Sequence, residues 1–426
     1  MLDIKFIKEN PSIIKEDLKK RNESKMLPWV DDVIKNYEDS LSFKKQSENL
    51  RQKRNTISKK INQLQKENRP AHREIQEAKT LPKKISGIEE KLLKAQEKVR
   101  YYLLRLPNVL HKSVPIGKDD TENKVVRKVG TPKKNPGKSH ADLLTDLNLL
   151  DGERAGKIAG HGFFYLKDEL ALLDFALMQF TMHFMKKRGY TIIEPPFMLK
   201  RKPYTGVTDL EAFEDVLYKI ENEDLYLIAT SEHPIGAMHM NEVFNKEDLP
   251  RKYVGISPCF RKEVGAHGKY TRGLFRMHHF NKIEQFIFSN PEDSWKYHEE
   301  LQKNCEDLYK KLGIPFQVVN VCTGDIGSIA AKKFDIEILM ADGEYREAGS
   351  NSNCTDYQAR RLNIKYRDRP GLPPKDFVHT LNNTAIATSR AMIGIIETHQ
   401  LKDGSIKIPA VLQPYMGGIK KISKIK

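Results

Sequence analysis

A heptad repeat of seven apolar residues between Ile85 and Leu106 constrains the fold of this chain more than any other feature of its sequence. A second stretch, from about Pro28 to Asn68, is helix-compatible and ends at Pro70, because proline cannot continue a helix. Two such helices predict an antiparallel hairpin, with Pro82 at the start or a kink of the second helix and Thr80 as its N-cap. The members of the repeat alternate spacings of three and four residues, the pattern of a heptad seam: Ile85, Ile88, Leu92, Ala95, Val99, Tyr102 and Leu106.

The positive charge of the chain is concentrated on this predicted hairpin. The chain carries a formal net charge of +16 and has a pI of about 9.3, and residues 1–106 hold 26 Lys and Arg against 16 Asp and Glu. Such an excess favours a polyanionic partner. Two interpretations stay open: a dimerising coiled coil or charge-solvated spacer, and an arm that binds RNA phosphates. For the second, the candidate contacts are Arg51, Lys53, Arg54, Lys59 and Lys60.

Other bulk features favour a cytoplasmic protein. The N-terminal segment MLDIKFIKEN lacks the apolar core of a signal peptide, and no run approaches the roughly 18 apolar residues of a membrane span. We therefore expect no membrane partner. We also expect no structural zinc and no disulfide framework, because the four cysteines form no C-x-x-C pair: Cys259, Cys305, Cys322 and Cys354.

A stretch rich in Pro, Gly and Lys separates the hairpin from the rest of the chain. It includes LPNVLHKSVPIGKDD and VGTPKKNPGKSH, which favour turns and loops. We expect a helical N-terminal domain over residues 1–106, a linker over 107–140 and a larger domain over 141–426.

The stretch from Ile256 to Phe288 predicts two strands joined by a long polar loop. Arg261 and Glu263 lie two residues apart, so on a strand they would point to the same face. An arginine at the end of a rigid strand can bind a phosphate or carboxylate through two hydrogen bonds. The carboxylate can accept from an exocyclic amino group such as that of adenine, and Phe280 can stack under a base. A basic hairpin with a solvated tip is the alternative, with loop residues Lys262, Gly265, His267, Gly268, Lys269, Arg272 and Gly273, followed by Arg276.

Two further segments carry polar groups suited to small ligands. Thr230, Ser231 and Glu232 follow an apolar run, where they can hold an ammonium group or cap a helix, and the two roles are compatible. Glu347 and Ser350 can present oxygens to a divalent cation such as Mg²⁺.

An arginine also lies at the junction of a predicted strand, from Leu381 to Ala387, and a predicted helix, from Ala391 to Thr398. Arg390 can face an anion there together with the helix N–H groups, or it can make a surface ion pair.

Taken together, these segments resemble the seryl-tRNA synthetases, a family of class II aminoacyl-tRNA synthetases. FR-x-E from Phe260 and R-x-H-x-F-N-K-x-E from Arg276 resemble motif 2, with His279 where the family usually has Gln. A helix over 168–188 followed by Gly189 and a short strand resembles motif 1, and the segment around Arg390 resembles motif 3. Residues 345–361, YREAGSNSNCTDYQARR, and the ending IPAVLQPY also match the family. The wording KEVGAHGK resembles archaeal versions more than bacterial ones.

The resemblance implies an α+β fold: an antiparallel coiled-coil arm, then a class II catalytic domain built on a mainly antiparallel sheet with flanking helices. It implies a homodimer formed through motif 1 and an arm that grips tRNA(Ser). The implied activity is that of an ATP-dependent ligase in protein biosynthesis, which activates L-serine to seryl-adenylate with ATP and Mg²⁺ and then charges the 3′ end of the tRNA. Whether tRNA(Sec) is also charged stays open.

The resemblance also implies the site residues. Arg261 and Arg390 would be catalytic, and Phe280 and Arg390 would sandwich adenine. The serine contacts would be Thr230, Ser231, Glu232, Arg261, Glu284 and Thr384. The ATP contacts would be Arg261, Lys262, Glu263, Met277, Phe280, Glu347, Ala348, Gly349, Ser350 and Arg390, with Glu347 and Ser350 as the metal ligands.

Three rival functions remain on the same residues. The first is an adenylating enzyme that charges a carrier protein, against which the long basic arm argues. The second is a binding-only paralogue that grips RNA or a partner, which should have lost Arg261, Glu284, Glu347 or Arg390, and all four are present. The third is a dimeric scaffold with an inert nucleotide pocket, which serine-dependent turnover of ATP would exclude.

Overall fold

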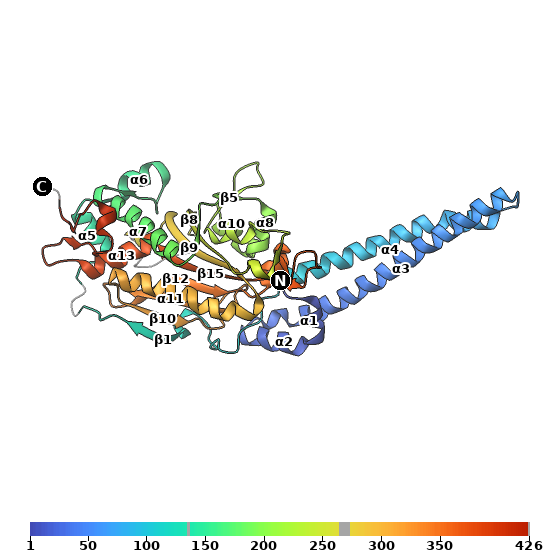
Figure 1. The fold of residues 1–426 in the computed structure, drawn as a ribbon, viewed down its shortest axis with the longest axis horizontal. Helices are drawn as coiled ribbons and strands as arrows, with labels where there is room; N and C mark the ends of the chain where they lie inside the picture. The colour runs from blue at the N-terminus through green and yellow to red at the C-terminus, as the bar shows by residue number, and fades with distance from the viewer. Residues whose placement is uncertain (134–136, 264–272, 425–426) are drawn as a thin grey trace. The chain divides into compact units, whose positions relative to one another are not determined.

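The structure, a computed structural model, describes residues 1–133, 137–263 and 273–424 (Figure 1). The described chain forms two compact units, Met1–Val109 and Leu110–Lys426. Five of the loop residues considered above lie outside the described residues: Gly265, His267, Gly268, Lys269 and Arg272.

The first unit is built around a long helical hairpin. Two short helices, α1 (Ile4–Glu9) and α2 (Pro11–Lys20), precede the hairpin helices α3 (Leu27–Lys66) and α4 (His72–Arg105). The hairpin is antiparallel, because Arg51 near the middle of α3 pairs with Glu89, whereas Lys60 near its end pairs with Glu74 at the start of α4. The predicted hairpin is thus confirmed, and its seam residues are buried or half-buried.

Of the two roles expected for Pro82, the start of the second helix is wrong, and the kink stays a prediction. Helix α4 begins at His72, and Pro82 lies in its interior. The Thr80 hydroxyl donates to the carbonyl of Glu77 in the preceding turn, so Thr80 is not the N-cap of the helix. Packing holds the helix together across the proline, because the adjacent Leu81 is 2% exposed and Ile85 is 6% exposed.

The second unit is organised by an eight-stranded sheet in the order β1-β10-β11-β12-β15-β9-β8-β4. All neighbouring strands in it are antiparallel except β4 and β8, which are parallel. This confirms the predicted α+β class. The strands are β1 (Lys124–Val129), β4 (Thr191–Ile193), β8 (Arg251–Phe260), β9 (His279–Ser289), β10 (Phe316–Asn320), β11 (Lys332–Leu339), β12 (Tyr345–Asn353) and β15 (His379–Ala387).

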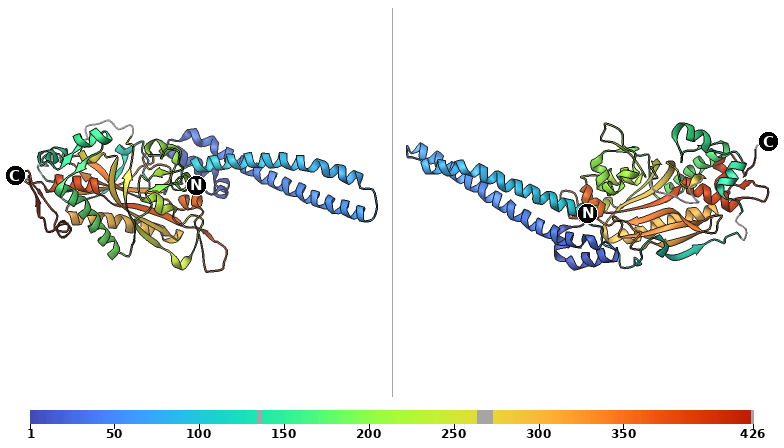
Figure 2. Two further views of the ribbon diagram at one scale, coloured as in Figure 1. Left: turned by 90° about the horizontal axis from the view of Figure 1, so that it is seen from above. Right: turned by 180° about the vertical axis from the view of Figure 1, so that it is seen from behind.

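Helices cover both faces of this sheet (Figures 1 and 2). One face packs against α7 (Asp168–Lys187), α11 (Ser294–Leu312) and α13 (Thr388–His399), which form the larger core. The other face packs against α8 (Arg201–Val207), α10 (Glu232–Ala237) and α12 (Tyr357–Leu362). Alternation along β9 serves both cores, because Ile283 and Ile287 belong to the first and Phe286 and Phe288 to the second.

The segment expected to be a linker, residues 107–140, is structured in part. It contains β1, which pairs with β10 at the edge of the sheet. Asn123 also fastens it to the body, because its side-chain oxygen accepts from Cys322 N at 2.8 Å and its amide donates to Asp325 at 2.9 Å. Pro and Gly content predicts irregular backbone, but it does not tell whether that backbone is packed.

The helix and strand expected over 168–194 are present as α7 and β4, with Gly189 between them at a φ of 82°. Three apolar side chains on these elements remain exposed: Phe175 is 60%, Leu172 45% and Ile192 38% exposed. Among the described residues, no helix has the length and apolar character needed to span a membrane.

Candidate active site

One cavity of about 650 Å³ lies between the sheet and the layer that contains α8 and α10. Eight of the predicted site residues line it, although they come from five separate parts of the chain: Thr230, Glu232, Arg261, Glu263, Glu284, Glu347, Ser350 and Thr384. The predicted contacts that do not line it are Ser231, Lys262, Met277, Phe280, Ala348, Gly349 and Arg390.

The floor of the cavity is a pair of facing residues on neighbouring strands. Glu284 on β9 is directly opposite Thr384 on β15, and the threonine hydroxyl donates to Glu284 Oε2 at 3.3 Å. Lys282, two residues earlier on the same strand face, places Nζ 2.7 Å from the same oxygen. Burial raises the pKa of Glu284, and the ammonium of Lys282 opposes that shift. The cavity therefore offers a carboxylate and a hydroxyl, held by a buried cation.

A second carboxylate stands beside this floor at the start of α10. Glu232 Oε1 accepts from the side-chain amides of Asn382 at 3.2 Å and Gln358 at 3.3 Å. Burial raises the pKa of Glu232, and the negative charge of Glu284 raises it further. A cation that entered the cavity next to Glu232 would relieve both effects.

The two residues before Glu232 have different environments. Thr230 lines the cavity, and its hydroxyl accepts from the backbone N–H of Glu232 at 3.2 Å. Ser231 is fully buried, and within the described ranges its hydroxyl makes no capping bond. It lies against Gly255, where an added Cβ would come within 2.8 Å of the Ser231 oxygen. Ser231 therefore packs behind the cavity wall.

Arg261 lies one residue beyond the end of β8. Its backbone N–H donates to the carbonyl of His278 at 3.0 Å, and its Nε donates to the carbonyl of Ala229 at 3.3 Å. Its guanidinium carbon is 5.3 Å from the centre of the Phe280 ring. These contacts hold the Arg261 guanidinium at the cavity wall, next to the Phe280 ring.

The expectation that Arg261 and Glu263 share one strand face is wrong. Strand β8 ends at Phe260, and Glu263 has a φ of 50°, outside the range of strands. Glu263 still lines the cavity, and it pairs with Arg276 at 3.1 Å. Lys262, between them, extends away from the cavity, with its Nζ 6.0 Å from the Tyr218 ring centre.

A β-bulge brings Glu347 and Ser350 to the same side of β12. The two residues are three apart, so a regular strand would point them to opposite faces. Strand β11 pairs its consecutive residues Ile336 and Glu337 with Gly349 and Glu347, which leaves Ala348 as an extra residue. Both oxygen-bearing side chains therefore line the cavity.

Ala348 and Gly349, two predicted site residues at the bulge, determine the path of the backbone there. Ala348 is 3% exposed and packs in the larger core. Gly349 allows β12 to approach β15, because an added Cβ there would lie 3.0 Å from Cβ of Thr384.

A buried carboxylate that was not assigned a role supports the Glu347–Ser350 pair. Asp335 on β11 is 4% exposed, and it accepts from the Ser350 hydroxyl at 2.5 Å. Burial and the nearby charge of Glu347 both raise the pKa of Asp335. Carboxylate and hydroxyl oxygens gathered in this way are the donors that Mg²⁺ prefers, so the residues fit that ion. Within the described ranges, no cluster of three His, Cys, Asp or Glu side chains could hold a metal by itself.

Arg390 lies at the start of α13 and is not among the residues that line the cavity. Its guanidinium carbon is 3.4 Å from the centre of the Phe275 ring. Burial lowers the pKa of Arg390 to about 10, and its Nη1 is buried with no hydrogen-bond partner among the residues that the structure describes. An unpaired buried N–H is costly, so this atom is suited to an anionic ligand.

Phe280 and Met277 line a separate hollow of about 60 Å³, together with Asp174 and His279. His279, the departure from the family pattern, stacks on Phe260 with ring centres 5.2 Å apart.

Sequence reasoning did not single out Lys282 or Asp335 as site residues. Lys282 had a signal, because it stands two residues before Glu284 in the strand that carries the motif. Asp335 had a weaker one, since it alternates with Glu337 and Lys333 on β11, and only the fold brings it to Ser350.

Known families match both units of this chain. A model of the seryl-tRNA synthetase N-terminal domain matches residues 1–110, and one of the tRNA synthetase class II core domain (G, H, P, S and T) matches residues 215–399. A serine–tRNA ligase from the archaeon Methanocella arvoryzae is 52% identical over 422 residues, which cover 98% of this chain and 99% of the relative.

Solved structures of full length match as well. The seryl-tRNA synthetase of Pyrococcus horikoshii complexed with ATP has a TM-score of 0.93 and 45% identity, and the match covers 100% of both chains. The cytoplasmic serine–tRNA ligase of Naegleria fowleri in complex with AMP has a TM-score of 0.87 and 37% identity, covering 100% of this chain and 99% of the other.

The raised pKa of Asp335 predicts how stability depends on pH. Because the folded state binds this proton more tightly than the unfolded state, the protein loses stability as the pH rises through the folded pKa. Asn resembles the protonated side chain and can still accept from Ser350. We expect Asp335→Asn to stabilise the ligand-free protein by about 1 to 3 kcal/mol at pH 9 and to have little effect at pH 5. Thermal unfolding at both pH values measures this.

Glu344→Gln is the control, because it removes one carboxylate from the exposed turn before β12. An Asp335→Asn variant that is less stable than the parent at pH 9 would contradict the assigned cause.

Proposed function

This chain belongs to the seryl-tRNA synthetase family and is an ATP-dependent serine–tRNA ligase, and we propose that the cavity described above is where it forms seryl-adenylate. L-serine and ATP would bind there side by side, and the seryl group would then pass to the 3′ end of tRNA(Ser). The observation that carries this proposal is the facing pair of Glu284 and Thr384 on the floor of a cavity that Arg261 also lines. The cavity thus has groups for a hydroxyl and for a carboxylate.

Serine would bind through three sets of polar groups. Glu284 and Thr384 would bond its hydroxyl, Thr230 and Glu232 its ammonium, and Arg261 its carboxylate. The raised pKa of Glu232 supports the ammonium site, because a bound cation would stabilise the ionised carboxylate. Ser231 would act only by supporting Thr230 and Glu232 from behind, since it is buried away from the cavity.

Activation is the attack of the serine carboxylate on the α-phosphorus of ATP. A carboxylate oxygen forms the new P–O bond, and the bond to pyrophosphate breaks. This chemistry needs alignment of two anions and neutralisation of their charge, with no protein nucleophile. Arg261 would bridge the carboxylate and the α-phosphate. Arg390 would bind the phosphates beyond it, and its unpaired Nη1 supports this role.

The remaining ATP contacts surround these two arginines. Phe280 and Arg390 would enclose the adenine, with Glu263 on its amino group and Met277 nearby. Lys262, Ala348 and Gly349 lie outside the lining of the cavity and would act by shaping the backbone around it. Glu347 and Ser350, with Asp335 behind them, would hold Mg²⁺, which when bound neutralises charge on the ATP phosphates.

The helical hairpin would bind the tRNA. Three of its five candidate cations already pair with glutamates across the hairpin: Arg51 with Glu89, Lys53 with Glu77 and Lys60 with Glu74. Arg54 and Lys59 are exposed and form no ion pair within the part of the chain that the structure describes. We therefore favour Arg54 and Lys59 as phosphate contacts. The same arm would serve tRNA(Sec) if that tRNA is also charged.

The functional division of the chain would follow from these roles. Residues 1–106 would form the tRNA-binding domain, 107–140 the connection and 141–426 the catalytic domain, and the protein would act in the cytoplasm, where tRNA is charged. A homodimer would form through α7 and β4, which correspond to motif 1. The exposed apolar side chains of Leu172, Phe175 and Ile192 support this interface.

Arg261→Ala is expected to reduce serine-dependent ATP–pyrophosphate exchange by about a thousand-fold or more, because it removes the cation shared by both reacting anions. Arg251→Ala is the matched control. It removes an exposed arginine at the other end of β8, where it pairs with Asp248 at 2.9 Å. Near-normal exchange by a folded Arg261→Ala variant would refute the assigned site.

Replacing both Arg54 and Lys59 by alanine should raise the KM for tRNA about five- to ten-fold and make binding less dependent on salt, since two phosphate contacts are lost. Exchange without tRNA should not change. The control replaces Lys5 and Lys19, two exposed lysines of the short helices, by alanine. Equal effects of the two double variants would indicate that only the overall charge matters.

Phe175→Glu should convert the dimer into monomers, because it places a charge within the proposed apolar interface. Sedimentation velocity measures the change, and Leu93→Glu on α4, where the leucine is 55% exposed, is the control. Dimers of unchanged stability in Phe175→Glu would exclude this face.

A further inference from the structure

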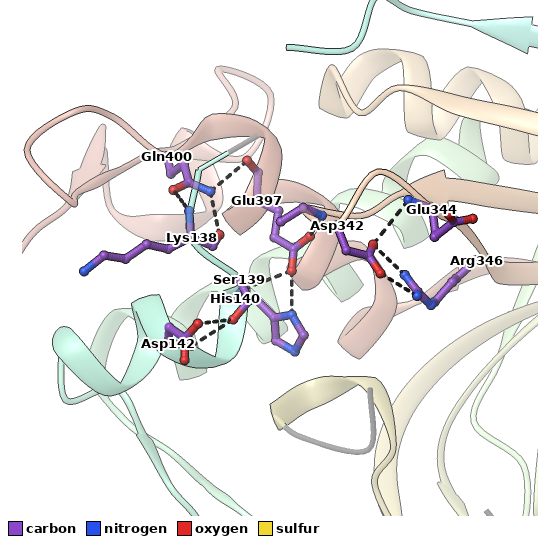
Figure 3. Close-up of polar contacts among 10 residues, drawn as sticks. Lys138, Ser139, His140, Asp142, Asp342, Glu344, Arg346, Glu397 and Gln400 are labelled. Atoms are coloured by element: carbon purple, nitrogen blue, oxygen red, sulfur yellow. Dashed lines mark hydrogen bonds and ion pairs between the residues drawn. The ribbon is translucent and has the colours of Figure 1, made fainter. Parts of the chain in front are cut away.

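The carboxylate of Glu397 joins three segments that are far apart in the sequence (Figure 3). Glu397 lies in the last turns of α13. Its Oε1 accepts from the backbone N–H of His140 at 2.9 Å and lies within hydrogen-bond distance of Nδ1 of the same residue, at 2.7 Å. Its Oε2 accepts from the backbone N–H of Ala341 at 2.6 Å. Both side chains are almost fully buried, at 3% exposure for Glu397 and 2% for His140.

This position is unfavourable for a carboxylate on local grounds alone. The C-terminal end of a helix carries partial negative charge, which repels an acidic side chain, and burial without partners would add to the cost. The three donors from α5 (His140–Asp146) and from the turn after β11 offset it. The contact therefore depends on all three segments holding their relative positions.

The edge of the His140 ring that faces away from Glu397 lies next to Gly273, shortly before the second part of the motif 2 pattern begins at Arg276. An added Cβ at Gly273 would come within 2.7 Å of His140 Nε2 and within 3.1 Å of Cβ of Ala141. Gly273 also has a φ of 68°, which other residues rarely adopt. The ring of His140 therefore packs directly against the backbone at Gly273.

Gly273 begins the short helix η5 (Gly273–Phe275), which carries the aromatic ring under Arg390. Leu274, between them, is fully buried in the larger core. Because Gly273 and Phe275 belong to one turn, a displacement of Gly273 also displaces the Phe275 ring.

Arg390 and Glu397 belong to the same helix, α13, and are seven residues apart. Residues with that spacing lie on one side of a helix, about 10 Å apart along its axis. The contacts therefore form a closed circuit: Glu397 holds His140, His140 supports Gly273, and Phe275 in the same turn supports Arg390.

We propose that His140 and Glu397 are a positioning pair that fixes the Phe275 platform under Arg390. They touch no substrate, and they would act on ATP binding only through that platform. The inference rests on the proposed function, in which Arg390 binds the ATP phosphates. The serine side of the cavity, on β9, β15 and α10, lies outside the circuit, so the pair should affect ATP and leave serine binding unchanged.

A double-mutant cycle on the full-length protein tests this proposal. The KM values for ATP and for serine are measured by pyrophosphate exchange in His140→Ala, in Phe275→Leu and in the double variant. We expect each single change to raise the KM for ATP about five-fold, with the KM for serine within about two-fold of the parent. The KM for ATP of the double variant should be no higher than that of the more impaired single variant, because both changes remove the same support.

Two further variants separate positioning from general stability. His140→Asn keeps a donor for Glu397 but removes the ring edge at Gly273, so the thermal midpoint should stay near that of the parent while the KM for ATP rises. Ser139→Ala removes the cap of α5, in which the Ser139 hydroxyl accepts from Asp142 N at 3.3 Å, and should leave the KM for ATP unchanged.

The results also distinguish this inference from the proposed function. If Arg390→Ala weakens exchange while His140→Ala and His140→Asn keep the parental KM for ATP, the positioning pair is refuted alone. Additive effects in the double variant would refute it too. If Arg390→Ala leaves exchange unchanged, the assignment of Arg390 fails first.

Discussion

The pairing of β8 with β9 is the constraint on which most of the site depends. It runs without a bulge through ten positions, from Arg251 opposite Phe288 to Phe260 opposite His279. Because strand side chains alternate, this register turns Lys282 and Glu284 toward the cavity and Ile283 and Ile287 into the core. A slip of one residue would bury the lysine among helices and expose the isoleucines. The register that buries the isoleucines in the core is therefore the same register that places the polar side chains on the cavity floor.

The opposite wall of the cavity requires an interruption of the same regularity. The bulge at Ala348 turns Glu347 and Ser350 to one side of β12, and Asp335 then fixes the Ser350 hydroxyl. A carboxylate buried beside another carboxylate is unfavourable, and the nearby ammonium of Lys333 offsets this only in part, because the pKa of Asp335 is still raised. The site is therefore less stable than it would be with neutral side chains, as expected where a binding site takes precedence over stability.

Much of the fold was predictable from the sequence, and the reasons differ by element. The heptad seam predicts the hairpin because burial along a helix has a fixed period, whereas Pro82 misled because packing outweighs one lost hydrogen bond. The family pattern named eight of the residues that line the cavity. Their spacing could not reveal the end of β8 before Arg261, the bulge at Ala348 or the burial of Ser231, because these depend on partners distant in sequence.

The central claim is that Glu284 and Thr384 recognise a hydroxyl. Both are buried, at 1% and 6% exposure, so a ligand without a hydroxyl would leave polar groups unpaired. The direct measurement is ATP–pyrophosphate exchange by the unaltered protein with serine, alanine, glycine and threonine in parallel. We predict exchange with serine and a kcat/KM for alanine lower by about a thousand-fold or more. Exchange with alanine at a rate near that of serine would contradict it.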